Sequence, residues 1–350
     1  MNLREIKATI FAMLSAILYA VSSPISKLLL KEISPTLMAG FLYLGAGLGM
    51  SILGLIKKKT EVNKKEAKLT KNEIPYTIAM VLLDILAPIF LMIGLTYTSS
   101  ANASLLNNFE IVATSIIALM FFKEAISKRL WVSISLITLS SILLTVEDIS
   151  SVSFSFGSIL VIMACICWGI ENNCTRRLAI KDPLEIVVIK GFGSGIGSLL
   201  IAFIIGERRI NMSYIIMAMI LGFFAYGLSI FFYIYAQRDL GAAKTSTYYA
   251  ISPFIGVALS FIIFRDIPNI LFSIALIIMI IGTYFASTEV HNHNHKHREL
   301  NHEHSHCHND GHHKHLHKNE IKGYHSHVHY HTEVVHSHKH TQDIHHSHSH

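Results

Sequence analysis

The chain has 350 residues, of which 51% are apolar and only 15% are charged, whereas a soluble protein carries roughly 25% charged residues. The formal net charge is +6, and the basic excess lies mostly in short loops between apolar segments, as membrane orientation requires. The composition therefore excludes a soluble enzyme, gives no support to nucleic-acid binding, and predicts an integral membrane protein whose partner is the lipid bilayer.

The apolar segments have the length of transmembrane helices. A helix needs about 20 predominantly apolar residues to cross a bilayer, and ten segments qualify, joined mostly by short connections. We therefore predict an all-α integral membrane protein with ten spans. They cover residues 8–30, 36–56, 74–96, 101–122, 129–147, 157–176, 184–205, 212–236, 243–264 and 268–288.

The positions of the basic residues predict the orientation. If the N-terminus is cytoplasmic, 17 Lys and Arg residues lie on the cytoplasmic side, seven of them in the connection 57–73, and four lie outside. Cytoplasmic loops of membrane proteins carry the excess of Lys and Arg. The sequence thus predicts a multi-pass protein of the plasma membrane with both termini in the cytoplasm.

The two halves of the membrane region are similar in sequence. Residues 17–30 (ILYAVSSPISKLLL) align with 166–179 (ICWGIENNCTRRLA), and 115–126 (SIIALMFFKEAI) align with 256–267 (GVALSFIIFRDI). Each half holds five spans, an odd number, so the halves have opposite orientations in the membrane. Inverted repeats are typical of secondary transporters, with the substrate site near the midplane. We predict a first five-helix repeat at 1–148, a second at 149–290, and a tail at 291–350.

These segments resemble a known family. Residues 95–127 (LTYTSSANASLLNNFEIVATSIIALMFFKEAIS) are similar to the signature region of the EamA family of the drug/metabolite transporter superfamily, and 241–266 carries the proline usual there, Pro253. The resemblance implies ten helices, cytoplasmic termini and export of a small organic molecule, without identifying it. Two features depart from the family: Glu110 and Ile111 stand where a proline is usual, and the tail is an addition.

Ionisable residues inside the spans are candidates for a functional site, because charge inside a bilayer is costly. Asp84, Glu110 and Glu171 lie within the third, fourth and sixth spans. They could bind a cation or exchange a proton; the alternative is a protonated carboxyl in a structural interhelical hydrogen bond. With neighbouring polar and aromatic residues of the first, sixth and ninth spans, they predict a substrate cavity lined by Ser22, Ser23, Asp84, Asn107, Glu110, Trp168, Glu171, Asn172, Tyr248, Tyr249 and Ser252.

The seventh span holds a glycine-rich segment and a lysine. The sequence GFGSGIGS (191–198) lies inside an apolar span with no preceding strand, so we expect close helix packing rather than dinucleotide binding. The role of Lys190, which precedes this segment, is ambiguous from the sequence alone.

The tail is rich in histidine. All 23 histidines of the chain lie in 291–350, many in a His-x-His pattern, and the absence of apolar periodicity predicts a disordered segment. Neutral imidazole is a ligand for Zn, Ni, Co and Cu, so we predict that the tail binds one of these metals; a polar tail without a metal role is the alternative. The candidate ligands are His291, His293, His295, His297, His302, His304, His306, Cys307, His308, His312, His313, His315, His317, His325, His327, His329, His331, His336, His338 and His340.

Three functions follow from these observations. The first is export of a small organic metabolite such as an amino acid, with the tail as a metal sensor or buffer. The second is transport of a divalent transition metal that the tail concentrates. The third, of another class, is a membrane-anchored metal store without transport. No nucleophile or metal-ligand constellation in the spans indicates an enzyme, no cofactor is required for the fold, and the oligomeric state stays open, a homodimer included.

Overall fold

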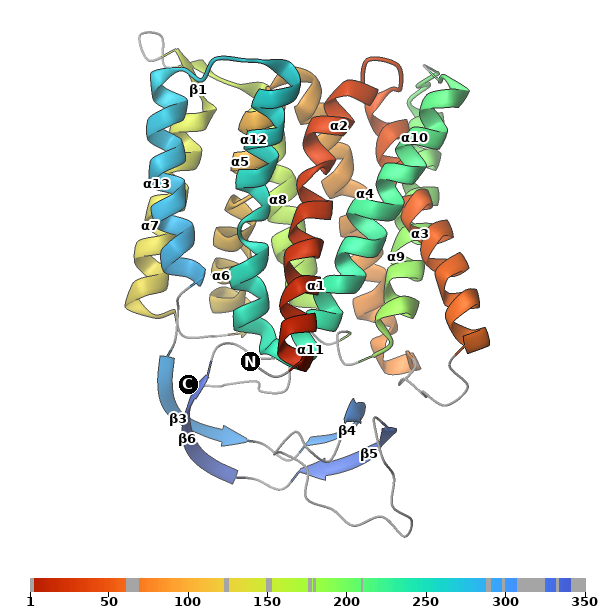
Figure 1. Cartoon of the computed structure of the whole chain (residues 1–350), viewed down its shortest axis with the longest axis vertical. Helices are drawn as coiled ribbons and strands as arrows, with labels where there is room; N and C mark the ends of the chain where they lie inside the picture. Colours follow the sequence, from red (N-terminus) through yellow and green to blue (C-terminus); the bar gives the residue numbers. More distant parts are fainter. Residues whose placement is uncertain are drawn as a thin grey trace.

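The computed structural model describes residues 3–60, 69–122, 126–148, 153–175, 178, 181–208, 210–287, 291–297, 300–306, 325–331 and 334–340. Among these residues, nine helical segments are long and apolar enough to cross a membrane, and one shorter apolar helix completes the set. The prediction of an all-α membrane protein with ten spans is confirmed. The helices stand side by side in one bundle (Figure 1).

The first half of the bundle supplies five spans, two of which are interrupted. The first span is α1 followed by α2, and the fourth is α5 followed by α6. The connections are short except at the lysine-rich segment after α3. The bounds are α1 Leu3–Ala20, α2 Ser22–Leu29, α3 Pro35–Thr60, the 3-10 turn η1 Lys71–Glu73, α4 Ile74–Tyr97, α5 Ser100–Leu106, α6 Phe109–Phe122 and α7 Lys128–Thr145.

The second half repeats this arrangement after the short hairpin of β1 (Val146–Asp148) and β2 (Ser153–Phe154). The eighth span of the chain, which is the third of this half, contains a π-helical turn, η2, where the helix widens. The bounds are α8 Phe156–Thr175, α9 Pro183–Ile204, α10 Met212–Gly222, η2 Phe223–Leu228, α11 Ser229–Tyr249, α12 Ser252–Phe264 and α13 Ile270–Ser287.

The ninth span differs from its predicted bounds of 243–264. Helix α11 continues through the expected loop to Tyr249, and the apolar helix α12 begins only at Ser252. The predicted bounds of the eighth and ninth spans leave a loop at 237–242 (QRDLGA), but glutamine, arginine, leucine and alanine are good helix formers, so the backbone there can stay helical. The break in the span therefore lies inside the membrane region rather than at its edge.

The helix contacts are consistent with a two-fold relation between the halves. If the first five spans are matched in order with the second five, the contact α4·α8 corresponds to α1·α11, α6·α8 to α1·α12, and α4·α9 to α3·α10. The pairs α3·α9, α5·α12 and α7·α13 each correspond to themselves. Helix α1 begins and α13 ends at the same end of the bundle, the lower one in Figure 1, as an even number of spans requires.

The glycine-rich segment of α9 provides close helix packing, as predicted. A Cβ atom at Gly191 would lie 2.5 Å from the Cα atom of Gly47 in α3, and one at Gly195 would lie 2.8 Å from the backbone nitrogen of Leu44. Only residues without a side chain allow two backbones to approach this closely. This packing fixes α9 against α3 and α4, and so positions Lys190, which precedes the segment.

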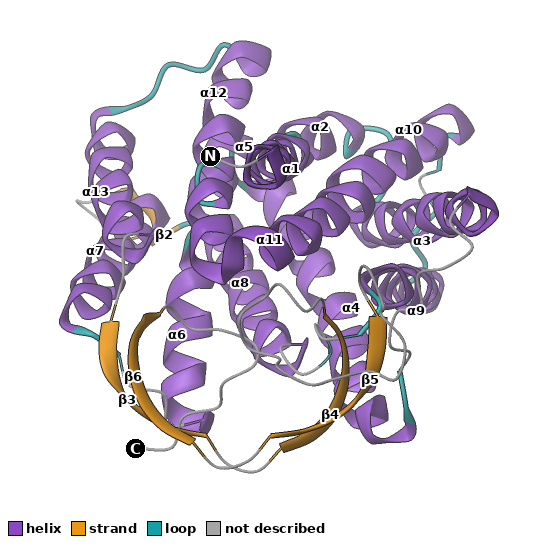
Figure 2. Cartoon of the chain, turned by 60° about the horizontal axis from the view of Figure 1, so that its bottom comes forward, coloured by secondary structure: helices purple, strands orange, loops and turns teal. Residues whose placement is uncertain are grey.

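The described segments of the tail have strand backbone, which differs from the disorder that the composition predicts. Strand β3 (His291–His297) pairs antiparallel with β6 (Val334–His340), and β4 (Leu300–His306) pairs antiparallel with β5 (His325–His331). Alternation of histidine with another residue has the two-residue period of a strand, and this explains the extended backbone. Figure 2 shows the two ribbons at the end of the bundle where α1 begins.

Candidate functional site

Three spans are interrupted near the middle of the bundle. Helix α1 ends at Ala20 before α2, α5 ends at Leu106 before the turn at Asn107 and Asn108, and α11 ends at Tyr249 before α12. The fourth and ninth spans are counterparts in the two halves, and discontinuous helices at corresponding positions mark the substrate site of many secondary transporters. The interruptions therefore locate the candidate site.

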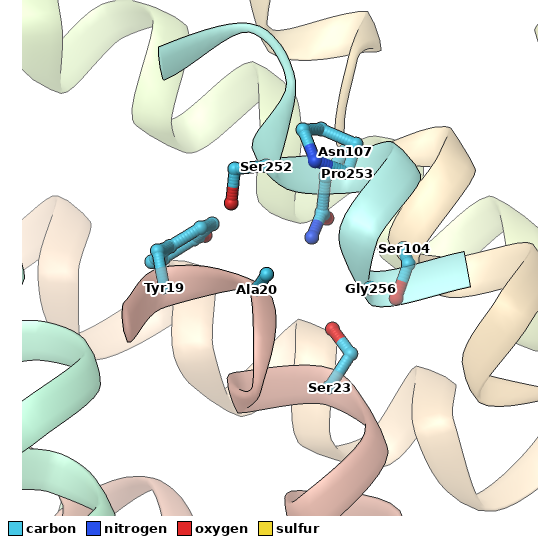
Figure 3. Close-up of a pocket in the computed structure, with 8 residues that line it drawn as sticks. All are labelled: Tyr19, Ala20, Ser23, Ser104, Asn107, Ser252, Pro253 and Gly256. Atoms are coloured by element: carbon cyan, nitrogen blue, oxygen red, sulfur yellow. The ribbon is translucent and has the colours of Figure 1, made fainter. Parts of the chain in front are cut away.

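A small cavity lies between these interruptions. Its volume is about 10 Å³, roughly the space that one water molecule needs. Figure 3 shows Ser23, Asn107 and Ser252 around the space between α1, α2 and α12. The lining residues come from both halves: Tyr19, Ala20, Ser23, Ser104, Asn107, Ser252, Pro253 and Gly256.

Three polar atoms of the cavity lining have no hydrogen-bond partner among the residues that the structure describes. Ser104 Oγ, Asn107 Oδ1 and Ser252 Oγ are all buried and unpaired, and their residues are 3%, 8% and 0% exposed. A buried polar atom without a partner costs about 1–3 kcal/mol, so such atoms need an explanation. Hydrogen bonds to a bound polar molecule would satisfy these three atoms together.

A cluster of charged side chains lies where α3, α4, α8 and α9 meet. Lys190 Nζ lies 3.0 Å from Asp84 Oδ2 and 3.2 Å from Glu171 Oε1, and Tyr43 donates a hydrogen bond to Asp84 Oδ1 over 3.2 Å. Asp84 is fully buried and Glu171 is 3% exposed. Thr175 donates a further hydrogen bond to Glu171. We call Asp84, Glu171 and Lys190 the charged cluster.

Glu110 belongs to a different group of contacts. Its Oε1 atom accepts a hydrogen bond of 2.6 Å from Asn172 Nδ2, and the same amide lies 3.3 Å from Thr114 Oγ1. A spacing of three residues would put Asn107 and Glu110 on one face of a continuous helix, but the turn at Asn107 and Asn108 separates them. Glu110 therefore links α6 to α8, whereas Asn107 lines the cavity.

Tyrosine rings lie between the cavity and the charged cluster. The ring of Tyr226 in η2 packs against Tyr19, which lines the cavity, and against Tyr43, which binds Asp84, with centroids 5.9 and 5.3 Å apart. Ser22 donates a hydrogen bond of 2.8 Å to Tyr226 Oη. Tyr249 packs against Tyr19 with centroids 5.8 Å apart. The two polar regions are thus connected through neighbouring side chains.

The predicted site residues divide among these regions. Ser23, Asn107 and Ser252 line the cavity; Asp84 and Glu171 belong to the charged cluster; Glu110 and Asn172 bind each other. Ser22 and Tyr249 contact the tyrosine rings between the cavity and the charged cluster. Tyr248, the residue before Tyr249, is half-buried, and Trp168 is buried in the main apolar core.

Sequence reasoning missed Tyr43, Ser104, Lys190 and Tyr226. The position of Lys190 in an apolar span marks it as a candidate functional residue. The sequence does not reveal its partners, because they lie on other helices. For the two tyrosines and Ser104, the residue type alone gave no signal, because such residues are common in membrane helices.

The predicted metal ligands lie in the tail. Cys307, His308, His312, His313, His315 and His317 lie outside the described residues, and the others lie in β3–β6. Among the side chains that the structure describes, no three His, Cys, Asp or Glu residues gather into a group that could hold a metal ion. The side chains of 291–350 are not among these, so metal binding by the tail stays a prediction.

Comparisons with known proteins agree with the fold. The model of the EamA-like transporter family matches residues 6–146 and again 155–288. An uncharacterized transporter of Methanothermobacter thermautotrophicus is 25% identical over 301 residues, covering 81% of this chain and 86% of that protein. The uncharacterized transporter YyaM of Bacillus subtilis is 24% identical over 252 residues, covering 69% of this chain and 81% of that protein.

A solved crystal structure is also similar to this chain. It superposes with a TM-score of 0.56 at 14% sequence identity and covers 80% of this chain and 96% of its own. At this identity the likeness shows the fold alone. The double match of one family model is the finding that agrees best with two homologous halves.

Proposed function

The chain belongs to the EamA-like transporter family, and on this premise we propose that it exports a small polar organic metabolite, such as an amino acid, by alternating access. It is a multi-pass membrane transporter and not an enzyme. We place it in the plasma membrane with both termini in the cytoplasm, because the connections expected to be cytoplasmic hold the excess of basic residues.

The unpaired polar atoms of the cavity carry this proposal. Ser104 and Ser252 offer hydroxyl groups and Asn107 offers an amide oxygen, a set that suits a molecule with both donors and acceptors. The cavity lining holds no charged side chain among its residues. At about 10 Å³, the cavity is too small for such a molecule, so binding requires the open state of an alternating-access cycle.

The charged cluster argues against a divalent metal as the cargo of the membrane region. Two of the three carboxylates that could bind a cation, Asp84 and Glu171, already share the ammonium group of Lys190. A divalent cation would have to displace this lysine, and it would find the remaining carboxylate, Glu110, bound to an amide. A neutral or zwitterionic molecule needs no such displacement.

Removal of the unpaired hydroxyls tests the proposal. We expect that Ser104→Ala and Ser252→Ala each lower the exchange of labelled for unlabelled amino acids across proteoliposomes roughly fivefold, the value of one hydrogen bond of about 1 kcal/mol. Folding should be unaffected, because neither hydroxyl has a hydrogen-bond partner in the described part of the chain.

Ser133→Ala and Ser198→Ala are matched controls, because these hydroxyls are equally buried and unpaired but lie away from the cavity. We expect both controls to exchange at the wild-type rate. Equal losses in all four variants would contradict the location of the site. Absence of exchange for every amino acid in the wild-type protein would contradict the amino-acid class.

The histidine tail gives a second proposal, that it binds a divalent transition metal and buffers or senses it in the cytoplasm. His-x-His repeats throughout 291–350 and the preference of Zn, Ni, Co and Cu for imidazole support this function. Since the described membrane region offers no cluster of metal ligands, we assign metal binding to the tail and transport to the helices.

Truncation after Val290 tests this division. We expect that the truncated chain loses binding of Zn²⁺ and Ni²⁺ but keeps amino-acid exchange. Metal binding by the full chain should be strong above pH 7 and lost by about pH 5.5, because protonated imidazole cannot ligate a metal and its ordinary pKa is about 6.5. Isothermal titration with each metal salt measures the loss of metal binding and its pH dependence. Exchange across proteoliposomes measures the transport that the truncated chain keeps.

Cellular metal content separates this assignment from metal transport. If Glu110→Gln combined with Glu171→Gln changes the metal accumulated by cells while the tail is intact, the membrane region itself moves metal. If loss of the tail abolishes every phenotype and the carboxyl substitutions change nothing, the chain is a metal store.

A further inference from the structure

The charged cluster carries an imbalance of charge. It holds two carboxylates and one ammonium group, with Lys190 Nζ at 3.0 Å from Asp84 and 3.2 Å from Glu171. If all three groups are ionised, one negative charge remains in a buried position, and burial of an uncompensated charge is strongly unfavourable. One proton on a carboxylate would neutralise the cluster without disturbing its packing.

The two ion pairs of Lys190 have different places in the fold. The pair with Glu171 joins α8 to α9, both in the second repeat. The pair with Asp84 joins α9 to α4 and therefore connects the two repeats. Alternating access in transporters with inverted repeats moves one repeat against the other, so only the Asp84 pair has to break in such a movement.

We propose that the charged cluster is a proton-binding site in which Asp84 takes up the proton and thereby releases α4 from Lys190. The proton comes from water on one side of the membrane, leaves to water on the other side, and Lys190 stays protonated and paired with Glu171. This inference rests on the proposed function only where it couples the proton to export. The binding of the proton itself depends on no substrate.

The surroundings of Asp84 suit this role. Among the described residues, the titratable groups that face it are Tyr43 of α3, Lys190 of α9, Glu171 and Cys167 of α8, and Tyr226 of η2. Tyr43 can keep its hydrogen bond when Asp84 is protonated, since the second carboxyl oxygen can carry the proton. Tyr43 also packs against Tyr226, whose hydroxyl accepts from Ser22, so a change at Asp84 is close to residues that border the cavity.

The full-length protein in lipid nanodiscs tests the proton site by infrared spectroscopy. We expect that acidification of the wild-type protein produces a protonated-carboxyl band that is absent in Asp84→Asn and present in Glu171→Gln. Asp84→Asn should fold, because it leaves the neutral pair of Lys190 and Glu171. Asp84→Glu is the second variant, and its band should move to the frequency of a glutamic acid.

Hydrogen–deuterium exchange tests the release of α4. We expect the backbone amides of α4 to exchange several-fold faster in Asp84→Asn than in the wild type at alkaline pH. At acidic pH, after correction for intrinsic rates, the two proteins should exchange equally, because Asn resembles the protonated Asp. Glu171→Gln should keep slow exchange at alkaline pH, since the pair between the repeats is intact.

Three results would overturn the proposal. A carboxyl band that persists in Asp84→Asn shows that Asp84 takes up no proton, and a band lost only in Glu171→Gln assigns the proton to the other carboxylate. Exchange in α4 that is faster in Asp84→Asn by the same factor at every pH shows a purely structural ion pair. None of these measurements uses a transported substrate, so they stand whether or not amino acids are the cargo.

Discussion

The variant Lys190→Met is expected to lose about 3–5 kcal/mol of stability, the largest structural effect that we predict. Methionine matches the length of the lysine stem but removes the ammonium group that lies 3.0 Å from Asp84 and 3.2 Å from Glu171. Two carboxylates would then face each other in a buried site. Thermal unfolding of the detergent-solubilised protein, monitored by size-exclusion chromatography, measures this loss of stability.

Neutralising the two carboxylates should reverse most of this loss. Replacement of a whole buried ion group by uncharged residues of similar size is often neutral, whereas removal of one member is not. We therefore expect Lys190→Met combined with Asp84→Asn and Glu171→Gln to unfold near the wild-type temperature. Acidic buffer should also stabilise the single variant, because a protonated carboxyl needs no counter-charge.

Lys181→Met provides the comparison for this experiment. Lys181 is also buried, but its ion pair with Glu73 is longer, at 3.7 Å, and Glu73 is partly exposed at the end of the bundle. Exposed or partly exposed pairs contribute about 0–1 kcal/mol, so this variant should be only slightly less stable than wild type. Similar losses in the two variants would contradict the special position of Lys190 between two acids.

The fold could be predicted from the sequence because its main determinant is local. Apolar length identifies each span, and an odd number of spans per repeat fixes the inverted relation, so neither inference needs a contact between distant residues. Where the structure differs, as in the part of α11 that begins at Gln237, good helix formers continue the helix across a boundary that hydropathy places in a loop.

The site could be predicted only in part, because its geometry depends on distant contacts. Asp84 and Glu171 attract notice as carboxylates in apolar helices, but the sequence does not show that one lysine lies between them. The break at Asn107 and Asn108 is equally hidden: two asparagines are compatible with a continuous helix, and the turn that separates Asn107 from Glu110 follows from packing in the bundle.

The same limit applies to Gly256, which the sequence did not single out. In the structure a Cβ atom at this position would lie 2.9 Å from Ser104 Oγ and 3.1 Å from the carbonyl oxygen of Ala20. The glycine therefore keeps open the part of the cavity where α1, α5 and α12 approach one another. Its function is visible only when three helices are in place.

We expect Gly256→Ala to lower amino-acid exchange at least tenfold. One methyl group added to a tight binding pocket changes binding by about 1–3 kcal/mol, or roughly 10–200-fold, and the cavity of about 10 Å³ has no room for it. Exchange across proteoliposomes gives the rate, and thermal unfolding of the same preparation reports whether the fold is preserved.

Gly282→Ala separates loss of the cavity from tighter packing. A Cβ atom at Gly282 would lie 3.0 Å from Ile137 Cγ1 and 3.1 Å from Leu136 Cβ, which is as close as at Gly256, but these contacts lie between α13 and α7, away from the cavity lining. Both variants should unfold at similar temperatures, and only Gly256→Ala should lose exchange. If both lose it equally, crowding between helices explains the defect, and the substrate does not bind where the interrupted helices meet.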